Sequence, residues 1–308
     1  MIIAESVKSS FTYEVIKIFK LYDILNVGII NLNDPFHSLR WLDSEKIYMR
    51  QIEANVTDSC NLNCKACTHY SNIFGDGDFY SIDDYSRDIR QIANCVDVAD
   101  FYILGGEPFK LKNLDEYLKL TRKFLPNTNL RIVTNGLLIP NTPQYILDAL
   151  RENQFVVDIS MYLPTVRMID QITEVFKKNN IPHNTREHVR FFNAFLSLRG
   201  GHNPQKSRAV CCNDGCRFLR NGKIYKCPVD ALSFKFAEHF SLKDFPAATG
   251  VDIFAKNFSS QVERLDGSVE LCTWCNENAR QIAWTPENNP KLTDWLADPS
   301  EIENFLPK

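Results

Sequence analysis

Three cysteines with three and then two residues between them, Cys60, Cys64 and Cys67, constrain this chain more than any other feature. Asn61 and Asn63 favour turns over helix interiors, so we expect a loop whose thiolates converge on one small inorganic group. Three thiolates are one fewer than the four that close a structural zinc or iron–sulfur site. A [4Fe–4S] cluster held by three cysteines keeps one iron with an open coordination position.

The run from Cys60 to Cys67 resembles the CxxxCxxC motif of the radical S-adenosylmethionine (radical SAM) superfamily, and residues 51–57 read as the strand that feeds it. The resemblance implies that the open iron binds SAM, whose cleavage gives a 5′-deoxyadenosyl radical that abstracts a substrate hydrogen. The superfamily usually has an aromatic residue before the third cysteine, where this chain has Ala66; Tyr70 is our candidate for the adenine contact. The alternatives are a zinc site completed by His69 and three reduced structural thiols.

The composition places the chain among ordinary globular proteins, with 308 residues, 44% hydrophobic and 24% charged. The net charge of −3 and a pI near 6.1 supply no basic stripe for nucleic acid. No apolar run approaches the length of a membrane span, and the first residues do not read as a secretory signal. Ten cysteines in metal-type spacings therefore indicate metal or redox chemistry in a reducing cytoplasm.

From residue 50 onward the pattern alternates strand and helix. We expect strands at 51–57, 101–104, 130–134, 155–161 and 185–191, with helices at 81–95, 114–124, 143–153 and 165–179. Such alternation predicts a parallel sheet with active groups at the carboxyl ends of the strands. Four or five units cannot close an eight-stranded barrel, so the expected fold is α/β, a partial (β/α) barrel like the radical SAM core.

Three parts of the chain are expected. Residues 1–48 form an N-terminal extension with a helix over 10–25, a strand over 27–31 and a turn at 34–35. Residues 49–200 form the partial barrel, and residues 201–308 form a small C-terminal iron–sulfur domain of hairpin and helices. Residues 196–210, with the breakers Gly200, Gly201 and Pro204, read as a linker or mobile loop.

A second motif, Gly105-Gly106-Glu107-Pro108, directly follows the strand expected at 101–104. Paired glycines let backbone groups approach a ligand closely, and Pro108 keeps the preceding residues out of a helix. The stretch resembles the GGE motif of the radical SAM superfamily, which implies binding of the amino group of SAM. An ordinary turn between strand and helix is the alternative.

Polar residues end the next strands. Asn135 and Ser160 lie at positions where the resemblance implies contacts with the ribose and carboxylate of SAM. Arg186 and Arg190 lie on the last expected strand, where they pair either with the SAM carboxylate or with surface carboxylates.

The last third of the chain holds six cysteines around an Asn221-Gly222 hairpin signal. The arrangement resembles the Twitch domain, a shortened SPASM domain that holds a second, auxiliary [4Fe–4S] cluster. Nine residues separate Cys212 from Gly222 and four separate Gly222 from Cys227, with Cys211 fitting nearly as well. The implied ligands are Cys212, Cys227, Cys272 and Cys275. A zinc ribbon is the alternative.

Two of Cys211, Cys212 and Cys216 are then spare, and one of these three is a candidate hydrogen-atom donor. We expect a hydroxylated small molecule or glycan precursor as substrate, undergoing dehydrogenation or epimerisation. The electron donor would be a flavodoxin or ferredoxin. The rivals are a peptide- or protein-modifying radical SAM enzyme and a non-catalytic iron–sulfur or zinc scaffold protein.

Overall fold

The computed structural model describes residues 2–5, 15, 28–31, 39–41, 43 and 45–304. Near the N-terminus, strands β1 (Ile2–Glu5), β2 (Gly28–Asn31) and β3 (Leu39–Trp41) form a small sheet of their own. Strand β2 confirms the strand expected at residues 27–31. The helix expected over 10–25, apart from residue 15, and the turn at 34–35 lie outside the described residues.

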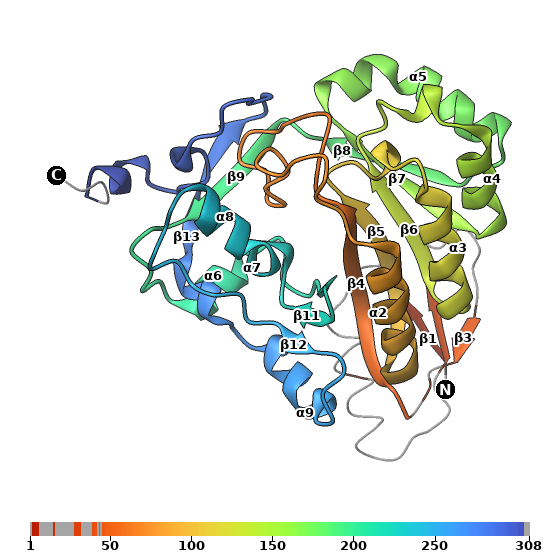
Figure 1. Cartoon of the computed structure of the whole chain (residues 1–308), viewed down its shortest axis with the longest axis horizontal. Coiled ribbons are helices and arrows are strands. Elements are labelled where there is room, and N and C mark those ends of the chain that lie inside the picture. The colour runs from red at the N-terminus through yellow and green to blue at the C-terminus, as the bar shows by residue number, and fades with distance from the viewer. Residues whose placement is uncertain are drawn as a thin grey trace.

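The larger sheet has eight strands in the order β12-β11-β10-β4-β5-β6-β7-β8 (Figure 1). Five consecutive neighbours run parallel: β4 (Ile47–Thr57), β5 (Val96–Gly105), β6 (Asn129–Thr134), β7 (Phe155–Met161) and β8 (His183–His188). This confirms the parallel sheet, and a partial barrel of the radical SAM type accounts for it.

Helices α2 (Ile82–Cys95), α3 (Leu114–Phe124), α4 (Gln144–Glu152) and α5 (Leu163–Lys178) follow successive strands and lie together on one side of the sheet (Figure 1). Each agrees with its expected range within two residues. The Ser81 hydroxyl caps α2 by accepting a hydrogen bond from the Asp84 backbone N–H at 3.2 Å. No helix among the described residues is both long and apolar enough to cross a membrane.

The strand expected at 185–191 is displaced, and this expectation was wrong in its bounds. Strand β8 ends at His188, and Phe191 begins a separate strand, β9 (Phe191–Leu196). Strand β9 leaves the large sheet and pairs antiparallel with β13 (Cys275–Ala283). Most β8 side chains are exposed at the sheet edge, so no alternation of buried apolar residues marks where this strand ends.

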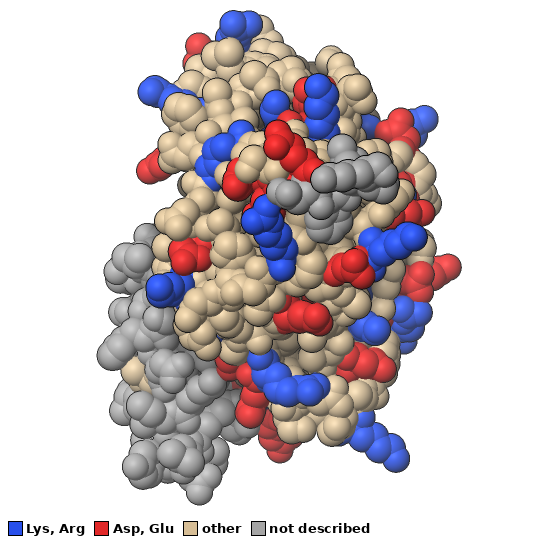
Figure 2. Space-filling model, turned by 90° about the vertical axis from the view of Figure 1, so that its left-hand side faces the viewer, with Lys and Arg blue, Asp and Glu red and all other residues tan. Residues whose placement is uncertain are grey.

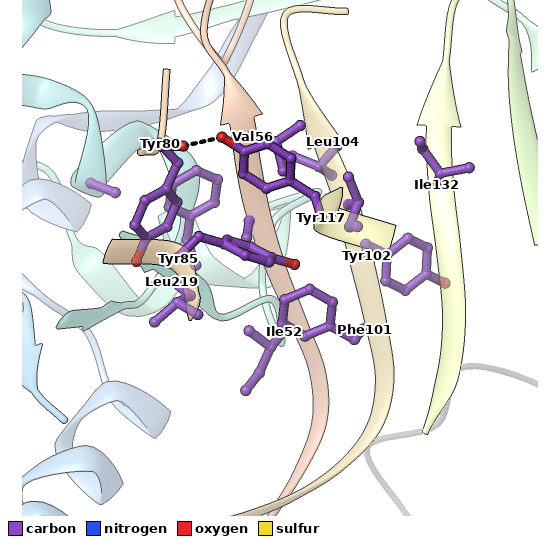
Figure 3. Packing of buried hydrophobic residues seen from close by; sticks show 14 of the residues in the cluster. Ile52, Val56, Tyr80, Tyr85, Phe101, Tyr102, Leu104, Tyr117, Ile132 and Leu219 are labelled. Atoms are coloured by element: carbon purple, nitrogen blue, oxygen red, sulfur yellow. Dashed lines mark hydrogen bonds between the residues drawn. The ribbon is translucent and has the colours of Figure 1, made fainter. Parts of the chain in front are cut away.

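Strand β4 separates two different environments. Ile52, Ala54 and Val56 are fully buried toward the helices, beside the tyrosines of α2 and α3 (Figure 3). The Tyr117 hydroxyl donates to the Tyr80 carbonyl in this packing. The alternate residues of β4 face the other way and are polar but also buried: Gln51, Glu53 and Asn55. The helix side of the sheet is thus an apolar core, while its inner side is a polar surface.

The last third of the chain joins the same sheet. Strands β10 (Phe218–Arg220) and β11 (Lys223–Tyr225) form the expected hairpin, and β10 pairs parallel with β4. The remaining elements are β12 (Val251–Asp252), α7 (Pro228–Ala231), α8 (Ser233–His239) and α9 (Phe258–Val262). Lysine, arginine, aspartate and glutamate side chains are interspersed on the face shown in Figure 2, without a patch of one sign.

The expectation of an irregular loop over residues 196–210 was wrong in part, because this stretch contains helix α6 (Pro204–Ala209). The Asn203 side chain caps α6 by accepting from the backbone N–H groups of Gln205 and Lys206. An asparagine followed by proline is a helix start signal, and reading Pro204 only as a breaker missed it.

A buried carboxylate on α2 holds the hairpin turn. Asp88 is fully buried and accepts hydrogen bonds from the Gly222 backbone N–H, the Tyr80 hydroxyl and, at 2.8 Å, the Arg87 Nε. One side chain of the barrel thereby satisfies the turn between β10 and β11. The C-terminal hairpin is fixed to the barrel by polar contacts as well as by β-pairing.

We expect Asp88→Ala to lower the free energy of unfolding by about 3 kcal/mol, since it leaves buried donors on Gly222 and Tyr80 without an acceptor. Urea denaturation followed by circular dichroism measures this. Asp83→Ala removes an exposed carboxylate from the same helix and should cost less than about 1 kcal/mol. Equal losses in the two variants would contradict this role for Asp88.

Candidate functional site

The three leading cysteines lie in the irregular segment between β4 and α2, at the carboxyl end of the first parallel strand. Positive φ angles at Asn63 (48°), Ala66 (57°) and Tyr70 (52°) turn the chain repeatedly. Asparagine tolerates this left-handed conformation better than most residues do. The segment is therefore a loop, as the asparagines indicated, and we call residues 60–67 the cluster loop.

The thiols of the cluster loop lie close to one another, with Cys64 buried and with Cys60 and Cys67 partly buried. Burial raises the pKa of Cys60 and of Cys64 to about 12, and the charge of Cys67 adds to both shifts. Hydrogen-bond donors point at the sulfurs: the Trp284 indole Nε1 lies 3.1 Å from Cys64 Sγ, and Asn135 Nδ2 lies 3.8 Å from Cys60 Sγ. Donors aimed at sulfur favour the thiolate, the form that binds metal. The donor set thus fits an iron–sulfur cluster.

The zinc alternative that used His69 does not fit the geometry. His69 Nδ1 lies 3.1 Å from Asn55 Oδ1, and its ring lies edge-on to Phe218, with centroids 6.0 Å apart. This places the imidazole against β4 and β10. Among the residues that the structure describes, no three His, Cys, Asp or Glu side chains are grouped for a single metal ion. In a [4Fe–4S] cluster each thiolate binds a different iron, so the cysteines need not meet at one atom.

The two glycines after β5 have a structural reason that the sequence did not reveal. A Cβ at Gly105 would lie 2.1 Å from the Thr57 carbonyl oxygen, and one at Gly106 would lie 2.0 Å from that of Ser59. The backbone N–H groups of Gly106 and Glu107 donate to these same oxygens, at 2.8 and 3.0 Å. The glycines let the end of β5 lie directly against the residues that lead into Cys60.

Glu107 is fully buried and bonded within the protein. Its carboxylate accepts from the Thr134 hydroxyl and the Asn135 backbone N–H, both at 2.8 Å, and from the Phe109 N–H at 3.2 Å. Burial raises the pKa of Glu107 to about 7 against the opposing effect of these bonds. Its charge also contributes to the raised pKa of Cys60. Glu107 therefore connects the end of β6 to the neighbourhood of the cluster loop.

The structure brings Asn135 to the cluster loop but not all the other candidates. Asn135 Nδ2 donates to Asn61 Oδ1 at 2.7 Å. Ser160 lies on β7, two residues before Tyr162, whose hydrogen bond to Cys64 partly offsets the raised pKa of that thiol. Arg186 pairs with Asp158 at 3.1 Å, and Arg190 Nε lies 3.4 Å from His188 Nδ1.

Tyr70 is a core residue. Its ring is fully buried between Phe236 and Trp295, with centroids 4.8 and 5.9 Å away. Burial raises its pKa well above the ordinary value, and the charges of Cys275, Cys227 and Cys67 add to the shift. Tyr70 thus lies between the cluster loop and the C-terminal cysteines, within electrostatic reach of both.

Cys211, Cys212 and Cys272 lie within electrostatic reach of Cys275, and Cys211 and Cys275 lie within reach of Cys227. Burial raises the pKa of Cys227 and Cys275, and further contributions come from within this group. The charge of Cys212 also adds to the raised pKa of Cys275 and of Cys211, and its own pKa is raised by burial and by Glu53. None of the ten cysteines of the chain forms a disulfide.

Cys216 lies on the polar inner face of the sheet. Its Sγ is 3.5 Å from Glu53 Oε1, and Gln51 Nε2 is 3.6 Å from the same sulfur. Gln51 Nε2 also donates to Glu53 Oε1 at 2.6 Å. Sequence reasoning missed Gln51 and Glu53 as site residues. Their alternation with Ile52 and Ala54 was the available signal.

A charged group that sequence reasoning also missed lies further along the sheet. Asp158 on β7 accepts from Arg131 on β6, with Nε at 3.0 Å, and from Arg186 on β8 at 3.1 Å. The Arg131 guanidinium lies 5.8 Å from the centre of the Tyr102 ring on β5. In the parallel pairing Glu53 on β4 lies beside Tyr102 on β5, and Tyr102 lies beside Arg131 on β6. These side chains continue the polar inner face across five strands.

Comparison with known proteins gives a family match over the barrel. The model of the radical SAM superfamily matches residues 54–196. A GTP 3′,8-cyclase of Geobacter sulfurreducens is 28% identical over 136 residues, covering 44% of this chain and 41% of that protein. One from Staphylococcus saprophyticus is 30% identical over 108 residues, covering 33% and 31%. The chain thus spans less than half the length of these relatives.

Solved structures with partial likeness include BtrN in complex with AdoMet and 2-DOIA, at a TM-score of 0.44 and 17% identity, covering 75% of this chain and 94% of that one. Another is native anSMEcpe with bound AdoMet, at a TM-score of 0.35 and 22% identity, covering 44% of this chain and 43% of that one. The family match includes the cluster loop, the glycine turn and strands β5 to β8. The match over residues 54–196 thus makes this part of the chain similar to the radical SAM superfamily, whose enzymes use a [4Fe–4S] cluster and SAM.

Proposed function

We propose that this radical SAM enzyme abstracts a hydrogen atom from a hydroxylated small molecule or sugar-like substrate, which is then dehydrogenated or epimerised. The observation that carries the proposal is the buried polar inner face of the sheet. When bound, the cluster and SAM supply the 5′-deoxyadenosyl radical. The protein has to hold both, bind the substrate in one orientation and keep competing hydrogen donors away.

Residues at the strand ends would hold the cofactors. Cys60, Cys64 and Cys67 would ligate the cluster. Gly105, Gly106 and Glu107 would form the SAM side of the site, with Asn135 and Ser160 on the neighbouring strand ends. Support comes from the contacts of Glu107 and Asn135, which join the ends of β5 and β6 to the cluster loop.

The inner face suits a substrate rich in hydroxyl groups. Gln51, Glu53 and Asp158 offer buried amide and carboxylate groups, and Arg131 adds a partly buried guanidinium. Gln51 is bonded to Glu53, and Arg131 to Asp158. Such groups recognise hydroxyls by hydrogen bonding and reject analogues that lack them. An apolar substrate would cover these polar groups without offering them a hydrogen bond, which is unfavourable.

An auxiliary [4Fe–4S] cluster in the C-terminal third is part of the proposal. We propose Cys227, Cys272 and Cys275 as three of the ligands and either Cys212 or Cys211 as the fourth, because the charge of each of these two adds to the raised pKa of Cys275. Cys216 and the remaining one of Cys211 and Cys212 would then not bind the cluster. Cys216 is the better hydrogen-atom donor, because Gln51 and Glu53 hold its thiol on the inner face.

The rivals predict different behaviour. A peptide-modifying enzyme would act on an extended peptide chain. A flavodoxin or ferredoxin would serve as electron donor for either kind of substrate. The scaffold alternative loses its basis because the superfamily is one of enzymes. Formation of 5′-deoxyadenosine by the reduced protein should rise with a panel of cyclitols and sugar nucleotides, and not with unstructured peptides. The reverse pattern would overturn the substrate class.

Anaerobically reconstituted protein should carry about eight irons, from two four-iron clusters. The triple change of Cys60, Cys64 and Cys67 to alanine should halve the iron and abolish SAM cleavage. The double change of Cys272 and Cys275 to alanine should remove the other half. Colorimetric iron analysis and chromatography of 5′-deoxyadenosine measure both. A wild-type content of about four irons would remove the auxiliary cluster from the proposal.

We expect Gly106→Ala to lower the iron content of the SAM-binding cluster as well as SAM binding. The added methyl group would meet the Ser59 carbonyl, directly before Cys60, at 2.0 Å. Gly77→Ala in the same connection is the control, since a Cβ there meets nothing within 4 Å. Iron analysis and SAM binding by equilibrium dialysis distinguish the two variants. Unchanged iron in Gly106→Ala would show that the loop tolerates the displacement.

Turnover in deuterated water separates the two reactions, using the panel compound that most raises 5′-deoxyadenosine formation. Epimerisation should leave one solvent deuterium at carbon, because the S–H bond of a thiol, exchanged with solvent, is weak enough to give its hydrogen atom to a carbon radical. One electron from the flavodoxin or ferredoxin and one proton from solvent would then restore the thiol. Cys216→Ala should abolish the incorporation of that deuterium. Cys95→Ala is the control and should leave it unchanged, because Cys95 lies on helix α2 and not on the polar inner face. A product two mass units lighter than substrate in both variants would identify dehydrogenation.

A further inference from the structure

The segment of residues 284–288, which follows β13, runs along the cluster loop. The Lys65 backbone N–H donates to the Thr285 carbonyl at 3.0 Å, and the Glu287 N–H donates to the Asn63 carbonyl at 2.7 Å. Cys64 and Pro286 form an antiparallel bridge between these two bonds. The segment therefore pairs with the cluster loop as a short β-ribbon, and we call residues 284–288 the C-terminal wall.

Trp284 is fixed from two sides. Its backbone N–H donates to the Arg190 carbonyl at 2.8 Å, where β9 begins. Its indole Nε1 donates to Cys64 Sγ at 3.1 Å, and its ring lies against Tyr162, with centroids 5.6 Å apart. The pairing of Ala283 with Phe191 at the end of β13 sets where Trp284 emerges. The indole donor is thus positioned by strand pairing and not by chance contact of a surface side chain.

Two residues further along the C-terminal part of the chain, Trp295 and Asp294, also contact the cluster loop. The Trp295 indole donates to the Cys67 carbonyl at 2.9 Å, and the Lys65 ammonium pairs with the buried Asp294 carboxylate at 3.0 Å. The C-terminal part of the chain therefore contacts the cluster loop at four residues: Asn63, Cys64, Lys65 and Cys67. Only at Cys64 does a side-chain N–H among these contacts reach a sulfur atom.

We propose that the C-terminal wall is part of the SAM-cluster site, and that Trp284 is a positioning residue whose indole N–H to Cys64 raises the cluster's reduction potential. The inference rests on the proposed function, because it requires a cluster on Cys60, Cys64 and Cys67. A donor to a ligand sulfur stabilises the added negative charge of the reduced cluster. A tryptophan more than two hundred residues beyond the motif thereby acts on the site's electron affinity.

The test compares Trp284→Phe with Thr285→Ala in reconstituted protein. Phenylalanine keeps an aromatic ring but removes the donor, while Thr285 contacts the loop through its backbone carbonyl, so its exposed side chain is dispensable. Redox titration followed by electron paramagnetic resonance gives the potential, and the signal that changes on adding SAM identifies the cluster. In Trp284→Phe the equilibrium constant for reduction of the SAM-binding cluster should fall about tenfold, which corresponds to a reduction potential about 59 mV lower for one electron. In Thr285→Ala the potential should not change.

Hydrogen exchange at the Lys65 amide reports whether the C-terminal wall remains docked. A lowered potential with the Lys65 amide still protected supports the proposal. An unchanged potential overturns it, as does a lowered potential that accompanies lost protection, since opening of the loop would then be the cause. Failure of the wild-type protein to bind iron or SAM would instead refute the proposed function.

Discussion

The close approach of the end of β5 to residues 57–59 determines the geometry of the whole site. Two glycines permit it, because any Cβ at these positions would meet a carbonyl oxygen at about 2 Å. The approach aligns the backbone N–H groups of Gly106 and Glu107 with oxygens just before Cys60. It also brings the Glu107 carboxylate within hydrogen-bonding distance of the Asn135 backbone N–H at the end of β6. The Asn135 side chain in turn donates to Asn61 in the cluster loop. Three consecutive strand ends thus depend on the space left by two missing side chains.

The two faces of β4 show how one strand serves both stability and chemistry. Ile52, Ala54 and Val56 are wholly buried against helices and contribute about 25 cal/mol for each Å² of apolar surface removed from water. Gln51, Glu53 and Asn55 are nearly as buried, and their burial is favourable only because each finds polar partners. The apolar face stabilises the sheet strongly enough to carry a buried polar face.

Local sequence signals predicted the fold well. The Ser81 cap, the Asn-Gly hairpin and the alternating units each depend on neighbours in sequence, and the structure confirms them. The bounds of β8 and the helix α6 were missed, since β8 carries little buried apolar pattern and Pro204 was read only as a breaker. The cysteine motif predicted the cluster loop. Trp284 and Asp158 reach the site through strand pairing, so their roles were not readable from sequence spacing, whereas Gln51 carried a signal in its alternation with Ile52.

The C-terminal third completes the barrel physically, whatever cofactor it holds. Strand β10 extends the sheet beside β4, and Arg220 on it forms an ion pair at 2.7 Å with the fully buried Asp58, which directly follows β4. A buried carboxylate without that partner would cost several kcal/mol, so the start of the cluster connection depends on the hairpin. On the other side, β13 and the residues after it pair with β9 and the cluster loop. The cluster loop is therefore held between barrel and C-terminal elements, so neither part presents the three thiols in this arrangement alone.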